Sequence, residues 1–159
     1  MKWAADGVGV CVDSHHQYAP KVAHDGSNGA VIAWIDTRAQ TIGDVYAARV
    51  DAAGAAVWGA GGTMICNNAA VQDTIQIVTL GKDSAAIAWQ DKRADNYDIY
   101  CQVVDAGGAL KWTADGVAIC KAAENQQALN MCTDNSGGLL FVWQDKRNGP
   151  VFEYHRPLV

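Results

Sequence analysis

The sequence predicts an all-β protein, and three features of its composition and pattern point to this fold class. Half of the 159 residues are hydrophobic, as in a globular domain. Glycine is frequent, and six Trp and five Tyr stand against two Phe, a balance that suits short strands joined by tight turns. No stretch has useful helical periodicity, because glycines interrupt most candidate helices.

An internal repeat narrows this prediction to one architecture. An apolar segment followed by W-x-D-x-R occurs three times, with tryptophans at Trp34, Trp89 and Trp143 that lie 55 and then 54 residues apart. Each copy also has a short segment ending in cysteine and a glutamine six residues later. These pairs are Cys11 and Gln17, Cys66 and Gln72, and Cys120 and Gln126. A period of this size predicts a β-propeller built of four-stranded antiparallel blades.

The first complete repeat shows which strands to expect. In order, they are 18–24, 30–36, 44–50, and a fourth strand that begins at 55–58 and resumes at 63–66. The turn after the first strand, Asp25-Gly26-Ser27-Asn28-Gly29, is rich in residues that tolerate positive φ. The second strand is nearly all apolar, so we expect neighbours on both its faces. The third alternates, which places Val45, Ala47 and Arg49 on one face and Tyr46, Ala48 and Val50 on the other.

Three blades do not close a ring, because propellers use about four to eight. The chain therefore reads as one half-ring domain over 1–159, with repeats at approximately 13–66, 67–120 and 121–159 and with 1–12 as a closing strand. We expect a homodimer of six blades, in which each N-terminal strand completes the partner's last blade and no sheet edge stays exposed. The alternative is that the chain is a fragment of a longer propeller.

The repeat also resembles a known family. A D-G-x-x-G turn, a strand ending in W-x-D-x-R and D-[IV]-Y before V-D-A-x-G resemble the repeats of TolB-type propellers and of secreted bacterial multi-domain proteins. The resemblance implies a scaffold in an extracytoplasmic setting that binds proteins or glycans or acts as a spacer, and related rings house hydrolases. It implies no particular reaction.

Charge excludes two classes of partner from our expectations. The net charge is −5 and there is no run of Lys or Arg, which argues against nucleic acid and against anionic membranes. The apolar stretches are too short to span a bilayer, and the first seven residues lack the apolar core of a signal peptide.

The strongest candidate site residues are the acidic and basic members of the repeated motif. At i and i+2 they share a strand face, where opposite charges pair. They also lie at the loop end of the strand, where a propeller would bind a ligand. We favour a structural ion pair, because function tends to break the symmetry of a repeat. The residues are Asp36 and Arg38, Asp91 and Arg93, and Asp145 and Arg147.

Two further sets recur in every repeat. Gln17, Gln72 and Gln126 begin the innermost strand, where they would either ring the mouth of the central channel or bond to the backbone of the neighbouring blade. The three motif tryptophans are expected to pack between blades rather than to serve as sugar platforms.

Residues that break the repeat give weaker candidates. His15 and His16 are adjacent and point to opposite faces of an extended chain, so they do not chelate one metal. Asp91, Asp95, Asn96 and Asp98 supply oxygens for Ca²⁺, but at a spacing that fits no known loop. The equivalent cysteines should lie too far apart to bridge, and Cys101 and Cys132 have no counterparts.

We therefore expect a non-enzymatic module, without metal or cofactor, that binds a protein or a carbohydrate or serves assembly. The alternative is an enzyme like the glycoside hydrolases, with its site on the top face of the assembled ring. Unrepeated polar residues gathered around the axis would favour the enzyme. The ones to watch are His15, His16, Asp95, Asn96 and Tyr97.

Overall fold

The computed structural model describes residues 5–39, 42–81, 84–134, 136–149 and 153–154. Within these ranges the chain forms eleven strands in three antiparallel sheets, and no helix. The all-β prediction is therefore confirmed, although the described chain does not close into a ring. No described segment is a helix long and apolar enough to cross a membrane.

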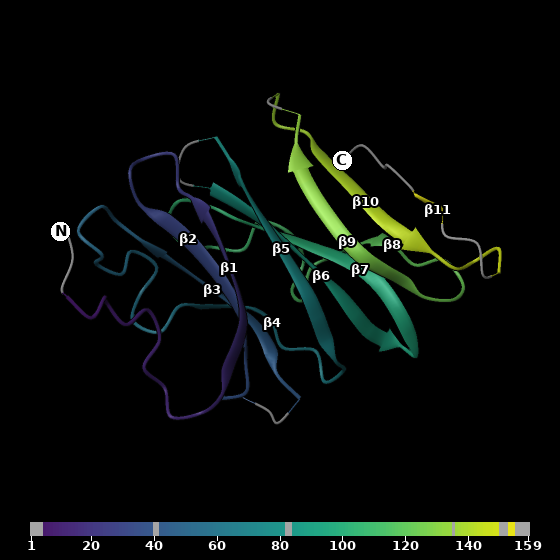
Figure 1. Ribbon diagram of the computed structural model, residues 1–159, viewed down its shortest axis with the longest axis horizontal. Coiled ribbons are helices and arrows are strands. Elements are labelled where there is room, and N and C mark those ends of the chain that lie inside the picture. Colours follow the sequence, from purple (N-terminus) through teal and green to yellow (C-terminus); the bar gives the residue numbers. More distant parts are fainter. Residues whose placement is uncertain (1–4, 40–41, 82–83, 135, 150–152, 155–159) are drawn as a thin grey trace.

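Each sheet follows the order of the sequence, with its first strand innermost (Figure 1). Sheet 1 holds β1 (Gln17–His24), β2 (Ala30–Asp36), β3 (Asp44–Val50) and β4 (Thr63–Cys66). Sheet 2 holds β5 (Gln72–Leu80), β6 (Ser84–Ala94), β7 (Asn96–Val104) and β8 (Val117–Cys120). Sheet 3 holds β9 (Gln126–Thr133), β10 (Leu139–Asp145) and β11 (Glu153–Tyr154).

The predicted strands of the first repeat match β1, β2 and β3 closely, but the expected start of the fourth strand at 55–58 is wrong. There Asp51 Oδ1 accepts hydrogen bonds from the backbone N–H groups of Ala53 and Ala55, which closes a turn. Only a single bridge, between Val50 and Ala56, follows before β4 begins at Thr63. The local side-chain bonds of Asp51 compete here with the sheet ladder.

Every innermost strand carries the same irregularity near its start. The register shifts after Tyr18, after Asp73, and between Val142 and Gln144 opposite β9. A non-glycine residue with positive φ lies in each first strand, at Ala19, Thr74 and Ala128. A β-bulge of this kind bends a strand and increases its twist.

The second strand of each sheet carries different side chains on its two faces. We call one the Trp face, because it bears the motif tryptophan, and the other the small-residue face. The Trp faces contain Ala30, Ile32 and Trp34 in sheet 1, Ala85, Ile87 and Trp89 in sheet 2, and Leu139, Phe141 and Trp143 in sheet 3. The small-residue faces contain Val31 and Ala33, Ala86 and Ala88, and Leu140 and Val142, respectively.

The core lies between neighbouring sheets. At each of the two junctions between sheets, a small-residue face packs against a Trp face. The small-residue face of sheet 1 packs with the Trp face of sheet 2, and the small-residue face of sheet 2 packs with the Trp face of sheet 3. On β3, Val45 and Ala47 join the first of these clusters, whereas Tyr46 and Ala48 pack on the other side with Trp34. The alternation on the third strand is confirmed. The expected covering of both faces of the second strand holds for β6, whereas β2 packs against another sheet on one face only.

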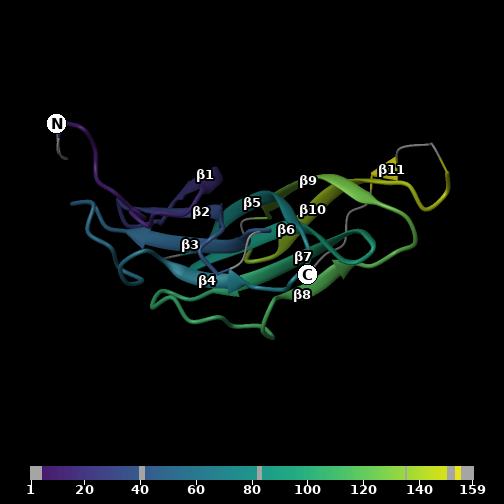
Figure 2. The ribbon, with the colours of Figure 1, turned by 90° about the horizontal axis from the view of Figure 1, so that it is seen from below.

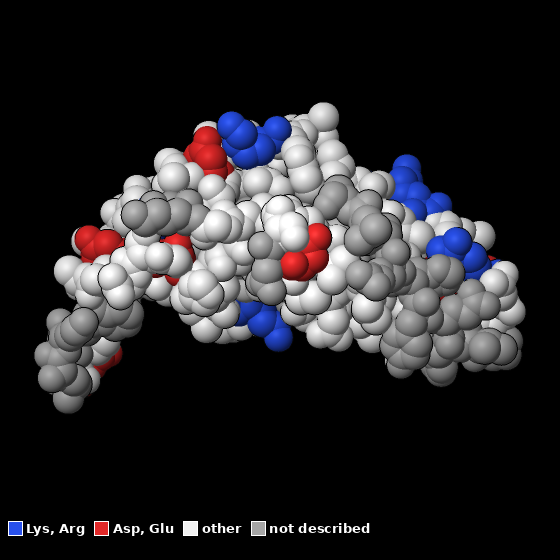
Figure 3. Space-filling view, turned by 90° about the horizontal axis from the view of Figure 1, so that it is seen from above, with Lys and Arg blue, Asp and Glu red and all other residues white. Residues whose placement is uncertain are grey.

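The inner strands bring the three sheets together. β1 contacts β5, and β5 contacts β9, so the first strands of the three sheets lie side by side along the middle of the molecule. From the side the sheets form a bowed array (Figure 2). One face of this bow carries scattered Lys, Arg, Asp and Glu and no large patch of one sign (Figure 3).

Candidate functional site

The W-x-D-x-R motif forms the same buried hydrogen-bonded unit at the end of β2, β6 and β10. The carboxylates of Asp36, Asp91 and Asp145 are fully buried. Each accepts a hydrogen bond from the indole Nε1 of the tryptophan two residues earlier, over 2.8, 2.9 and 3.0 Å. The motif tryptophan therefore packs its ring between sheets while its N–H anchors the aspartate.

The arginine of each motif completes the unit from the loop side. Its backbone N–H donates to Oδ1 of the aspartate at 2.9, 2.9 and 3.0 Å, and its guanidinium Nη2 donates to Oδ2 of the same residue. The predicted pairing of Asp36 with Arg38, Asp91 with Arg93 and Asp145 with Arg147 is confirmed. Each aspartate thus closes the turn that follows its strand.

The same arginines reach a cysteine that belongs to the preceding repeat. Nη2 of Arg38, Arg93 and Arg147 lies 2.8, 3.5 and 3.3 Å from Sγ of Cys11, Cys66 and Cys120, respectively. Cys66 ends β4 and Cys120 ends β8, so the latter two contacts join one sheet to the next. All five cysteines are free thiols, and three of them, Cys11, Cys66 and Cys120, hold the equivalent positions that we expected to lie too far apart to bridge.

Aromatic rings support the guanidinium groups in the two sheets where the third strand is fully described. Arg38 lies over the ring of Tyr46 at 4.4 Å, and Arg93 lies over that of Tyr100 at 3.8 Å. These tyrosines in turn stack on Trp34 and Trp89. Cation–π contacts of this kind stabilise a partly desolvated arginine.

The electrostatics of the unit fit a structural role. Burial raises the pKa of Asp36, but hydrogen bonds from Arg38 and Trp34 outweigh it and bring that pKa to about 2. The same balance lowers the pKa of Asp145. These carboxylates stay ionised with their oxygens engaged, so the repeated Asp–Arg pair is accounted for without a ligand. Binding of a ligand by the Asp–Arg pairs stays a prediction.

The glutamines that begin the inner strands bond to the loops that precede them. Gln72 Nε2 donates to the carbonyls of Asn68 and Ala70, and Gln126 Nε2 donates to those of Ala123 and Glu124. Both side chains are buried. Gln17 Nε2 likewise donates to a local carbonyl, that of His15. These bonds go to the backbone of the loop before each strand and not to the neighbouring blade, where the alternative had placed them. Ligand binding by the three glutamines stays a prediction.

A second buried carboxylate lies beside the motif aspartate in sheet 2. Asp98 is directly opposite Asp91 on the neighbouring strand and is 1% exposed. Burial, reinforced by the charge of Asp91, raises the pKa of Asp98. Its Oδ1 accepts from Asn96 Nδ2, whereas its Oδ2 is buried and has no hydrogen-bond partner.

The proposed Ca²⁺ loop does not assemble around Asp98. Asp95 is exposed, and Asn96 Nδ2 also donates to the carbonyls of Ala122 and Glu124. Among the described residues, no group of three His, Cys, Asp or Glu side chains is placed to hold a metal ion.

The adjacent histidines are also engaged locally. His15 Nδ1 lies 2.6 Å from Asp13 Oδ1, and the backbone N–H of His16 donates to Thr37 Oγ1. Both residues are exposed, in agreement with the expectation of exposed loop residues.

The structure reveals a hollow that the motif analysis missed. It measures about 380 Å³ and lies where the ends of β1, β5 and β9 converge. Its lining residues are His24, Thr79, Leu80, Gly81, Thr133 and Gly137. Three of them, His24, Thr79 and Thr133, lie seven residues after Gln17, Gln72 and Gln126 and so share one repeat position. A histidine in place of threonine in one copy is the signal in the sequence that marks this position.

Comparison with known proteins gives a fold and no family. No family model matches the chain. A glycerol kinase from Gloeobacter violaceus is 30% identical over 56 residues, which is 35% of this chain and 11% of the kinase. Among solved structures, the endo-arabinase from Bacteroides thetaiotaomicron matches over 96% of this chain and 59% of its own, with a TM-score of 0.58 and 13% identity. The chain is therefore similar in fold to an endo-arabinase and spans about three fifths of its length.

Proposed function

We propose that the three sheets are consecutive blades of a β-propeller that binds a polysaccharide in the hollow at the ends of β1, β5 and β9. The observation that carries this proposal is the similarity to the endo-arabinase over nearly the whole chain. The polar groups of His24, Thr79 and Thr133 supply donors and acceptors for sugar hydroxyls at one place. An arabinan is the first ligand class to test.

Side-chain geometry favours binding without hydrolysis. Glycoside hydrolysis ordinarily uses two carboxyl groups that flank the scissile bond. Among the described residues that line the hollow, none carries a carboxyl group. The motif aspartates Asp36, Asp91 and Asp145 are buried and paired with arginine, which removes them from such a role in this arrangement.

A glycoside hydrolase is the second candidate, and the structural comparison favours it over a purely assembling scaffold. The similar protein is named as an endo-arabinase. Since this chain spans 59% of it, the remaining sheets of an assembled ring would have to supply the carboxyl groups.

One experiment separates these functions. Affinity electrophoresis in gels that contain arabinan, with a glucan gel as reference, measures binding, and an assay of reducing ends measures hydrolysis. Retardation without new reducing ends supports the binding module, and new reducing ends support the hydrolase. Absence of both contradicts the polysaccharide proposal.

The matched variants are His24→Ala, which alters the hollow, and His16→Ala, an exposed histidine outside it. We expect His24→Ala to weaken retardation in the arabinan gel and His16→Ala to leave it unchanged. Equal retardation of both variants would show that the ligand binds elsewhere.

A further inference from the structure

Two sheet faces in the described chain have no neighbouring sheet. They are the Trp face of sheet 1 and the small-residue face of sheet 3. Val142 on the latter is 38% exposed, although its repeat equivalents Ala33 and Ala88 are fully buried. On the former, Ile32 is half-buried, whereas Ile87 and Phe141 at the same position are fully buried.

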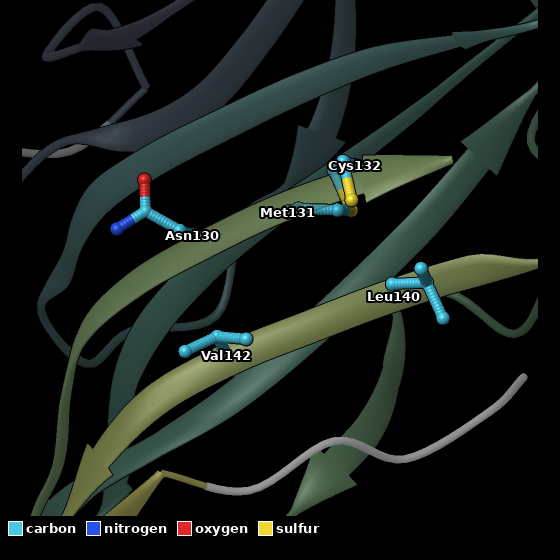
Figure 4. A pocket seen from close by; sticks show the side chains of 5 residues that line it. All are labelled: Asn130, Met131, Cys132, Leu140 and Val142. Carbon is cyan, nitrogen blue, oxygen red and sulfur yellow. The ribbon is translucent and has the colours of Figure 1, made fainter. Parts of the chain in front are cut away.

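Each open face contains an apolar hollow of about 210 Å³. The hollow on sheet 3 lies over β9 and β10, with Leu140 and Val142 along its floor (Figure 4). The hollow on sheet 1 includes Tyr18, Pro20 and Ile32. Val22, directly opposite Ile32, is 68% exposed beside it. Exposed apolar groups gathered on two faces indicate surfaces that pack against something.

The side chains show what fits these faces, because small side chains on one face are matched by large side chains on the face that packs against it. Where the small-residue face has two alanines, Ala86 and Ala88, the facing Trp face has the large pair Leu139 and Phe141. Where it has Val31 and Ala33, the facing pair is the smaller Ala85 and Ile87. Cores conserve total volume in this way.

The two open faces continue the same trend. Among the three small-residue faces, that of sheet 3 has the largest pair, Leu140 and Val142. The Trp face of sheet 1 has a small pair, Ala30 and Ile32, flanked by Pro20 and Val22 where sheet 2 has Ile75 and Ile77. The two faces without a neighbour are therefore the small-residue face with the largest side chains, on sheet 3, and a Trp face with small side chains, on sheet 1. Their side-chain volumes complement each other.

A backbone segment near the N-terminus adds an independent observation. Val10 and Cys11 pack on Trp34 and Tyr46 of sheet 1, and Cys11 receives the Arg38 contact. In the other two repeats these contacts come from the outer strands β4 and β8 of the preceding sheet. Residues 8–11 thus occupy the place of an outer strand, yet they pair with no strand in the described chain.

The backbone before this segment already has the conformation of a paired outer strand. Gly62 and Gly116, which precede β4 and β8, have φ of +83° and +79°, and a Cβ on either would overlap a Trp ring and a carbonyl oxygen. Gly7, at the same repeat position, has φ of +86° with no atom within 4 Å of its Cβ position. The missing neighbours would be the third strand of a sheet and the tryptophan of its second strand.

We propose that a second copy of this chain supplies that third strand and both missing faces. Residues 8–11 of one copy add to the outer edge of β11 in the other, and the Trp face of sheet 1 packs on the partner's sheet 3. The registers of β3 with β4 and of β7 with β8 place Cys11 opposite Glu153 and Gly9 opposite Tyr154. A two-fold axis makes both junctions at once, and the ring has six sheets. This inference does not depend on the polysaccharide proposal.

Light scattering after size exclusion tests the assembly, with Val142→Asp and Val22→Lys as face variants. Both residues are exposed in the single chain, so each variant should keep the fold. The native protein should have twice the chain mass of 16.9 kDa at micromolar concentration. Either variant alone should be monomeric, because each junction then buries an unpaired charge.

An equimolar mixture of the two variants should regain the dimer. The mixed dimer has one native junction and one in which lysine meets aspartate, since Ile77 and Met131, the equivalents of Val22, pack in the same clusters as Ala33 and Ala88. The control is Val57→Asp, an exposed valine outside both faces, which should remain dimeric. A monomeric native protein, a dimer that survives both face variants, or a mixture that stays monomeric would each overturn the proposal.

The reactivity of a native thiol gives a second readout that needs no substitution. Cys132 is exposed in the single chain and lies directly opposite Leu140 on the open face of sheet 3. Its modification by a thiol reagent should slow as protein concentration rises through the dimerisation range. A rate that does not change with concentration while the mass doubles would place the dimer contact elsewhere and overturn the proposal.

Discussion

The motif aspartate connects elements at three levels of the structure. In sheet 2, Asp91 accepts hydrogen bonds from the indole of Trp89, from the backbone N–H of Arg93 and from the guanidinium of the same arginine. That guanidinium also reaches Cys66 of the preceding sheet and the carbonyl of Asp115. One carboxylate therefore fixes a strand, the loop after it and the contact between two sheets.

Removing this charge should destabilise the fold severely. Asp91→Asn leaves the guanidinium of Arg93 largely buried without its counter-charge, a change that costs about 3 kcal/mol or more. Urea denaturation followed by tryptophan fluorescence measures the effect. Asp105→Asn is the control, because Asp105 is partly exposed and pairs with the exposed Lys111 over 3.7 Å, an interaction that solvent screens. Equal losses in the two variants would contradict the structural role assigned to Asp91.

Asp98 has the opposite effect on stability. Its pKa is raised by burial and by the charge of Asp91, so the folded protein holds its proton more tightly than the unfolded chain does. The contribution of Asp98 is favourable at acidic pH, and it is lost as the pH rises from about 4 through the raised folded pKa.

Asp98→Asn should therefore make the protein more stable than the native chain at pH 7. Its advantage should shrink as the pH falls toward about 4, where the native carboxyl is protonated in the folded state. Urea midpoints measured at several pH values test this, and Asp95→Asn at an exposed position should follow the native curve throughout. An Asp98→Asn variant that is less stable at pH 7 would show that the ionised carboxylate is favourably bound.

At the scale of the element, the bulge of the inner strand has a conformational cost that the repeat tolerates three times. Ala19, Thr74 and Ala128 have φ of 53°, 49° and 53°. This left-handed region is unfavourable for residues with a Cβ and most of all for a β-branched one. The bulge persists in each sheet because the same strand is held on both sides of it. The part before the bulge begins with the glutamine that bonds to the preceding loop, and the part after it pairs regularly with β2, β6 or β10.

Glycine at the β-branched member should relieve this strain. Thr74→Gly removes a left-handed cost of about 1–2 kcal/mol and adds an entropic cost of about 0.5–1 kcal/mol, for a net gain near 0.5–1 kcal/mol. Thr79→Gly, in the regular part of the same strand, should lower the free energy of unfolding by about 0.5–1 kcal/mol. Thermal unfolding of the two variants should therefore shift in opposite directions, and a fall in the midpoint of Thr74→Gly would contradict the strain.

At the scale of the molecule, each sheet depends on its neighbours for a core. The clusters at both internal junctions draw residues from two sheets, and no sheet buries both its faces by itself. A repeat of this kind is stabilised by the interfaces between units. The two faces left open in the single chain therefore expose to water apolar side chains whose equivalents at the internal junctions are buried.

If a second copy covers these faces, the thermal midpoint should rise with protein concentration. Mass action couples dimerisation to folding, so the native protein should show this over a roughly hundred-fold range of concentration. Val142→Asp should unfold at a midpoint that is lower and independent of concentration. A native midpoint that does not move over this range would argue for a fold whose stability does not need a partner.

The sequence by itself determined the period, the boundaries of the first three strands in the first repeat, the faces of β3 and the pairing of aspartate with arginine. These follow from side-chain alternation and from residues two positions apart, which are local properties of a strand. The false start at 55–58 arose because the Asp51 turn competes with the sheet through hydrogen bonds that a hydrophobic pattern does not record.

Only the tertiary structure decided which residues from different repeats meet. It brought His24 beside Thr79 and Thr133, joined each arginine to the cysteine of the preceding repeat, and left the faces of Ile32 and Val142 open. The physical reason is that these contacts depend on how one sheet packs on the next. That packing is set by the volumes on two facing surfaces together, and no single repeat contains both of them.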